Sequence, residues 1–122
     1  MSLTPTEDQI SALAAAAGDP APVVMLNLLR FREGDGAQTY GRYAEAVAPH
    51  LERVGGKVVF AAAAQDSVIG PVAPEWDLVI GVEYPSRAAF LDMVGDPDYL
   101  RVHELREEAL SDSRLIACAS IS

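Results

Sequence analysis

One amide side chain, Asn27, lies in the middle of an otherwise apolar segment, residues 23–31. The alternation of this segment predicts a strand with two mostly apolar faces, on which Met25 shares a face with Asn27. A buried amide that lacks hydrogen bonds costs roughly 1–3 kcal/mol. Two interpretations are therefore open. Either the neighbouring backbone or a buried water satisfies Asn27, or Asn27 donates to an oxygen of a ligand that Met25 also contacts.

Glu83 is a second candidate for chemistry, because it lies in another largely apolar segment, residues 76–84. A carboxylate that faces a partly apolar sheet should have a raised pKa, which suits it to proton abstraction. The alternative is structural, with Glu83 paired to Arg30 or Arg106. On the functional interpretation Glu83 is a catalytic residue.

Three further side chains, Tyr99, His103 and Arg106, fall on one face of a helix expected over residues 96–110. Histidine can act as a general acid or base near neutral pH, and arginine can bind a carboxylate. The alternative is a solvated helix flank that Arg106 seals. On the functional interpretation His103 is catalytic and Arg106 binds the substrate.

Tyr40 and Tyr43 follow helical spacing, and each combines an apolar body with a polar tip. Either they contact a substrate at the mouth of a pocket, or they belong to the core. His50 and His103 are the only histidines, there is a single cysteine, and no glycine-rich phosphate loop is present. We therefore expect neither a metal nor a cofactor.

The composition argues against several classes of protein. Nine Lys and Arg stand against eighteen Asp and Glu in 122 residues, and this net charge of −9 repels the phosphates of nucleic acids. No apolar run approaches the roughly 18–20 residues that span a bilayer, and the first residues show no secretion signal. We expect a cytoplasmic protein with neither a membrane nor a nucleic acid as its partner.

Hydropathy patterning predicts the elements that position these side chains. Helices are expected in residues 4–18, 40–54, 86–94 and 96–110, and strands in residues 23–31, 57–64, 76–84 and 114–120. Thr4 and Glu7 predict a capping box at the start of the first helix. We assign residues 1–20 to an N-terminal helix and linker, and residues 21–122 to a single domain.

The order of these elements after the first helix predicts the fold. Strand, helix, strand, strand, helix, strand is the α+β ferredoxin-like arrangement, βαββαβ, with a four-stranded antiparallel sheet and helices on one face. The second sheet face should then be polar, yet half of all residues are hydrophobic and the central strands are apolar on both faces. A second copy of the sheet can cover it. We predict a homodimer with sheets packed face to face.

Four segments carry a resemblance to known proteins: PVVMLNLLRFREG (22–34), YGRYAEAVAPHLERVGG (40–56), WDLVIGVEYPS (76–86) and DPDYLRVHELREEA (96–109). Together they resemble the dimeric α/β-barrel superfamily, most closely its bacterial domain-of-unknown-function family 1330. The resemblance covers about residues 22–120. It implies a homodimeric barrel with a pocket between sheet and helices in each protomer, and it implies no established reaction.

That superfamily includes cofactor-independent monooxygenases, haem-degrading monooxygenases and isomerases. Asn27 and His103 occupy places similar to site residues of the haem-degrading members, but those carry a Trp where this chain has Met93 or a neighbour, and the acidic charge also argues against haem. We predict a homodimer that oxidises or isomerises an apolar, oxygen-bearing small molecule without a cofactor. Asn27 would act with Glu83, His103 or Arg106. The alternative is a non-catalytic structural or ligand-binding homodimer.

Overall fold

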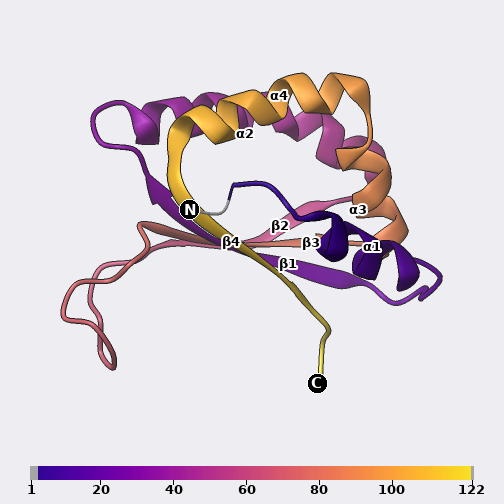
Figure 1. Ribbon diagram of the computed structural model, residues 1–122, viewed down its shortest axis with the longest axis horizontal. Coiled ribbons are helices and arrows are strands. Elements are labelled where there is room, and N and C mark those ends of the chain that lie inside the picture. Colours follow the sequence, from indigo (N-terminus) through magenta and orange to yellow (C-terminus); the bar gives the residue numbers. More distant parts are fainter. Residues whose placement is uncertain (1–2, 122) are drawn as a thin grey trace.

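The computed structural model describes residues 3–121, which form four helices and four strands. In chain order the elements are α1 (Glu7–Ala15), β1 (Val23–Phe31), α2 (Gly36–Val54), β2 (Lys57–Ala63), β3 (Leu78–Tyr84), α3 (Arg87–Val94), α4 (Pro97–Ala109) and β4 (Leu110–Cys118). The strands form one antiparallel sheet in the order β2-β3-β1-β4 (Figure 1). The predicted ferredoxin-like class, with an extra N-terminal helix, is confirmed.

Short polar side chains start three of the helices. Ser86 and Asp96 accept hydrogen bonds from backbone N–H groups at the first turns of α3 and α4. In α1 the cap is Thr6, which forms a reciprocal capping box with Gln9. The predicted start at Thr4 is therefore wrong, because the capping box that forms joins Thr6 to Gln9 and not Thr4 to Glu7.

Two element boundaries differ from the sequence prediction because of packing. α2 begins at Gly36, where the backbone approaches α4 so closely that a Cβ would lie 2.8 Å from the carbonyl oxygen of Ala109. β4 begins at Leu110, directly after α4, because this fully buried residue already has extended backbone angles. Pro49 lies inside α2 without ending it.

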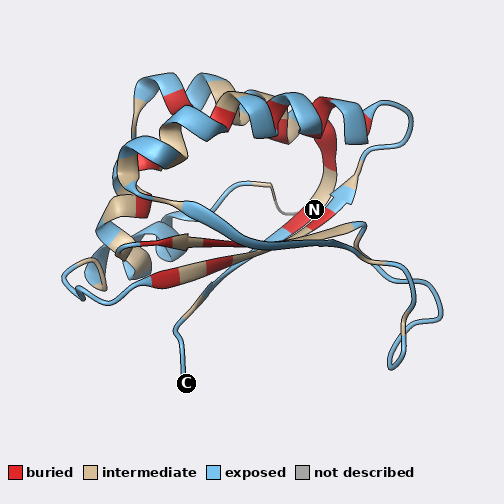
Figure 2. Ribbon diagram, turned by 180° about the vertical axis from the view of Figure 1, so that it is seen from behind, coloured by how far each residue is buried: buried red, intermediate tan, exposed pale blue. Residues whose placement is uncertain are grey.

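The sheet has two different faces. Helices α2, α3 and α4 cover one face, and no helix of residues 3–121 covers the other (Figures 1 and 2). Asn27 pairs in register with Ile80 and Leu115, so these three side chains share the helix-covered face. Leu26 and its partner Ile116 point to the opposite, uncovered face.

The uncovered face remains rich in apolar side chains. Phe60 and Ile116 are 45% and 46% exposed. The ring of Phe60 occupies the space beside Gly81 in which a Cβ would stand. The loop of residues 64–77 projects on this side of the sheet, and its Ile69 is almost fully exposed (Figure 1). In the isolated chain this surface has no cover.

The core lies between the sheet and the helices. Val23, Leu29 and Leu110 are fully buried there, and the ring of Tyr84 packs edge-on against Phe90. These contacts anchor both ends of the layer. They do not fill its middle, where the functional candidates lie.

Candidate functional site

A cavity of about 1050 Å³ separates the sheet from the helices. Side chains of β1, β3 and β4 line it from one side and those of α2, α3 and α4 from the other, while α1 and the residues before it contribute a third wall. Most of the lining is apolar. The predicted site residues among the lining are Met25, Asn27, Tyr40, Tyr43, His103 and Arg106. The structure therefore brings all predicted site residues except Glu83 to one cavity.

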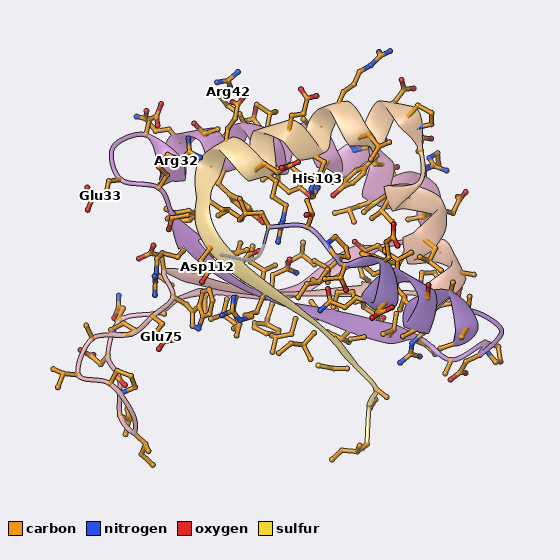
Figure 3. The ribbon with its side chains drawn as sticks, viewed as in Figure 1. Arg32, Glu33, Arg42, Glu75, His103 and Asp112 are labelled. Carbon is orange, nitrogen blue, oxygen red and sulfur yellow. The ribbon has the colours of Figure 1, made fainter. Side chains whose placement is uncertain are left out.

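A chain of polar contacts crosses the helical wall of this cavity. The hydroxyl oxygens of Tyr43 on α2 and Tyr99 on α4 lie 3.0 Å apart. Tyr99 Oη lies 3.3 Å from His103 Nδ1, and His103 Nε2 lies 3.6 Å from Glu107 Oε1. His103 projects from α4 toward the layer between helices and sheet (Figure 3). These contacts link the buried phenol of Tyr43 to the half-exposed carboxylate of Glu107.

The order of these contacts assigns the hydrogens. The carboxylate of Glu107 faces His103 Nε2, so Nε2 carries the hydrogen and Nδ1 accepts from Tyr99. The hydroxyl of Tyr99 then accepts from Tyr43. Burial lowers the pKa of His103 below its usual 6.5, and the nearby charge of Arg106 lowers it further. At neutral pH the imidazole is neutral and able to take up a proton.

All four tyrosines of the chain lie around this group. Burial raises the pKa of Tyr40 to about 12 and also raises the pKa values of Tyr43, Tyr84 and Tyr99. The positive charge of Arg106 acts in the opposite direction on all four without overcoming burial. At neutral pH the cavity therefore presents protonated phenols, which are hydrogen-bond donors.

The amide nitrogen of Asn27 donates its hydrogen bonds to the backbone. Nδ2 donates to the carbonyl oxygens of Met25 at 3.2 Å and Ile80 at 3.3 Å. Because both partners are acceptors, the amide orientation is fixed, and Oδ1 is the atom left to meet a ligand. The expectation that Asn27 donates to a ligand oxygen is corrected: Asn27 offers the cavity an acceptor. Met25 is buried beside it.

Glu83 lies away from this group. It pairs in register with Val24 and Lys57, on the face of the sheet that no described helix covers, and its carboxylate lies 3.5 Å from Lys57 Nζ. The predicted pairing with Arg30 or Arg106 is wrong, and Glu83 does not share the cavity with Asn27. The reason is strand alternation, which turns odd-numbered residues of β3 away from the helices.

Glu107 and Tyr84 were not among the candidates from the sequence, and Tyr99 was placed on the face of His103 without a role. Tyr99 and Glu107 flank His103 at intervals of four residues along α4, a spacing that places all three on one stripe of a helix. That spacing was a usable signal. Tyr84 reaches the cavity from β3, and no sequence pattern distinguishes it from an ordinary core tyrosine.

Two further properties of residues 3–121 bear on the site. Within this range no three His, Cys, Asp or Glu side chains gather closely enough to hold a metal ion. No helix in the range has the length and apolarity needed to cross a membrane. The described lining of the cavity includes phenolic donors, the neutral imidazole of His103, the amides of Gln9 and Asn27, and the guanidinium groups of Arg106 and Arg114. Arg114 is paired with the carboxylate of Asp112.

Comparison with known proteins places the chain in a family context. The profile of a domain of unknown function, DUF1330, matches residues 31–119. No curated protein matches the sequence.

Solved structures match over most of the chain. RPA0582 of Rhodopseudomonas palustris, a protein of unknown function, is 37% identical, with a TM-score of 0.91 over 98% of this chain and 97% of its own. A dimeric, ferredoxin-like protein of unknown function from Bacteroides fragilis is 10% identical, with a TM-score of 0.55 over 81% of this chain and 96% of its own. A hydroxynitrile lyase from Passiflora edulis is 12% identical, with a TM-score of 0.60 over 83% of this chain and 94% of its own. The last two share the fold alone.

Proposed function

The chain belongs to the DUF1330 family, as its sequence suggested, and from that premise we propose that it forms a homodimer that binds an apolar, oxygen-bearing small molecule between its sheet and its helices. The observation that carries this proposal is the cavity of about 1050 Å³, apolar for most of its lining and polar along α2 and α4. An apolar pocket with a few convergent polar groups is the usual form of a small-molecule site.

The homodimer is supported by the uncovered face of the sheet. Leu26, Leu28 and Val79 remain partly exposed there beside Phe60 and Ile116. Burying about 800 Å² per partner, much of it apolar at ~25 cal/mol/Å², exceeds the entropic cost of association. Ferredoxin-like neighbours from Bacteroides fragilis and Thermobifida fusca are described as dimeric, which supports the same arrangement.

The catalytic form of the proposal is proton transfer without a cofactor. Tyr43 is positioned to take a proton from a ligand as its own hydrogen passes to Tyr99, and Tyr99 passes its hydrogen to His103 Nδ1. Glu107 at Nε2 stabilises the imidazolium that results. Arg106 balances negative charge left on the ligand. Return of the proton to another atom gives isomerisation, and reaction of the ligand anion with O₂ gives oxidation.

A non-catalytic binding role is the second candidate, and Asn27 is the observation that favours it. Its Nδ2 hydrogens are taken by the backbone carbonyls of Met25 and Ile80, as expected for an amide whose role is structural. In that case the polar groups orient a ligand without transforming it. Both candidates require the cavity to be a binding site.

Binding is tested by thermal shift against quinones, phenolics, haem and acyl compounds. A ligand that binds only the folded state increases the free energy of unfolding by RT ln(1 + [L]/Kd), and the unfolding temperature rises as a result. Ala44→Trp fills the cavity wall on α2 and should abolish the shift, while Ala37→Trp, on the same helix outside the cavity, should retain it. No shift with any compound, or equal shifts in the two variants, contradicts the proposal.

Catalysis is tested on any compound that binds. Incubation in deuterated water followed by NMR reports exchange of carbon-bound hydrogen, and oxygen consumption reports oxidation. His103→Gln should remove either activity while leaving ligand affinity within a few-fold of wild type. Binding without exchange or oxygen uptake in the wild-type protein selects the non-catalytic role.

A further inference from the structure

Arg106 is a buried cation to which no carboxylate of the described residues is paired. It lies on α4, is 7% exposed and lines the cavity. None of the ion pairs among residues 3–121 includes Arg106. Its one hydrogen bond in that range runs from Nη1 to the backbone carbonyl of Leu3, at 3.5 Å. A buried guanidinium normally has a counter-charge, because removing the charge from water without one is strongly unfavourable.

The groups around Arg106 cannot provide that counter-charge. The charge of Arg106 acts on the phenols of Tyr40 and Tyr99, but burial keeps their pKa values raised, so both stay protonated at neutral pH. His103 is neutral or positive, never negative. Among the described residues that line the cavity, Glu107 is the only acidic one, and it contacts His103. Two guanidinium groups, Arg106 and Arg114, stand against this one carboxylate in the described lining, so the lining is net positive although the whole protein carries a net charge of −9.

We propose that the ligand of this cavity is an apolar monocarboxylate, whose carboxylate pairs with Arg106 in place of the Leu3 carbonyl. This inference rests on the proposed binding function and narrows its ligand class. Arginine presents two parallel N–H donors that match the two oxygens of a carboxylate. The hydroxyl of Tyr40 adds a neutral donor from the facing helix.

The rest of the cavity limits the ligand to one negative charge. The lining holds a second guanidinium, Arg114, but this group is already paired with the carboxylate of Asp112 at 3.0 Å, so Arg106 is the lining cation left for a ligand. Much of the remaining lining is apolar and includes Met25, Phe90 and Met93. A phosphate or dicarboxylate would leave a second charge against these side chains. A cavity of about 1050 Å³ accommodates a body the size of a bicyclic ring. The chemistry indicated is an acid group on a hydrophobic skeleton.

The test compares two probes of the same shape, 2-naphthoate and 2-naphthamide, by isothermal titration calorimetry at pH 7. Wild type should bind the carboxylate about tenfold or more tightly than the amide. Arg106→Gln should remove this preference. The matched control is Arg101→Gln, on the same helix, where the side chain is exposed and pairs with Asp98. That variant should keep the preference.

Each outcome decides one of two questions. If naphthamide binds as tightly as naphthoate to wild type, the cavity is a small-molecule site and the carboxylate inference is wrong. If neither probe binds, the inference is wrong and the binding function itself loses support. Should Arg106→Gln fail to fold by circular dichroism, the wild-type comparison still decides, and Arg106→Lys, which keeps the charge, should retain most of the preference.

Discussion

The hydroxyl oxygens of Tyr43 and Tyr99 lie 3.0 Å apart and join α2 to α4 inside the cavity wall. Both rings are buried, so this hydrogen bond is shielded from water. It connects two helices that are distant in sequence, and it continues through His103 to Glu107. The same contact is therefore part of the packing and part of the proposed proton path.

Removing either hydroxyl should destabilise the protein, and the two losses should not add. Tyr43→Phe and Tyr99→Phe should each lower the free energy of unfolding by about 0.5–1.5 kcal/mol, because each leaves a buried hydroxyl or nitrogen without its partner. The double variant should lose less than the sum. Urea unfolding measures all three. Tyr84→Phe, whose hydroxyl makes no hydrogen bond to the described residues, is the control and should lose less.

The four tyrosines should resist ionisation in the folded protein. Burial raises their pKa values, that of Tyr40 to about 12, so the stability they contribute is complete below pH 10 and is lost as the pH rises from about 10 toward 12. Ultraviolet titration should show little phenolate near pH 10 in the native protein, whereas about half of the tyrosine should be ionised at that pH in urea. A native midpoint near 10 would contradict this account of the cavity.

Acid should weaken the fold through His103. Its folded pKa lies below 6.5, so its contribution is complete above pH 6.5 and is lost as the pH falls through the folded pKa, because the unfolded chain takes up the proton first. Urea unfolding against pH should show this slope, and His103→Gln should reduce it. The carboxylate of Glu107 raises the pKa of His103, so Glu107→Gln should lower it further. NMR titration of the imidazole measures that change, and an upward shift would contradict the assignment.

The fold was predictable because its signals are local. The alternation of residues 23–31 and the helical spacing of residues 40–54 each identify an element without knowledge of the others. The position of Glu83 was not predictable in this way. Alternation within β3 places it on one face, but both faces of this segment are largely apolar, so the pattern does not show which face the helices cover. Tyr84 next to it, bulky and apolar in body, was the available hint that Glu83 points outward.

The candidate site was predictable only in part for a similar reason. Residues on one helix, such as His103 and Arg106, are related by spacing alone. The hydrogen bond between Tyr43 and Tyr99 depends on how α2 and α4 pack. One of the two hydrogen bonds from the amide of Asn27 depends on the carbonyl of Ile80 in the adjacent strand. Contacts between elements therefore decided which predicted side chains are still available to a ligand.

Two glycines of α2 should respond to alanine in opposite ways. Gly36 lies against the backbone of α4, where a Cβ would be 2.8 Å from the Ala109 carbonyl oxygen, so Gly36→Ala should destabilise by about 1–3 kcal/mol. Gly41 has nothing within 4 Å of the same position. Gly41→Ala should stabilise by about 0.5–1 kcal/mol, because alanine favours the helix. Urea unfolding of both variants checks the sign difference.

The apolar outer face of the sheet should make assembly measurable. Wild type should sediment at about twice the 13.0 kDa of one chain, and its unfolding midpoint should rise with protein concentration, as expected when folding and dimerisation are linked. Leu26→Asp places a charge between Gly81 and Ile116 on that face and should shift the equilibrium to monomer. Gln38→Asp, exposed on α2, should leave the dimer intact. A wild-type chain that sediments as a monomer at micromolar concentration, with a midpoint independent of concentration, would show that this face is exposed in solution and that the homodimer proposal is wrong.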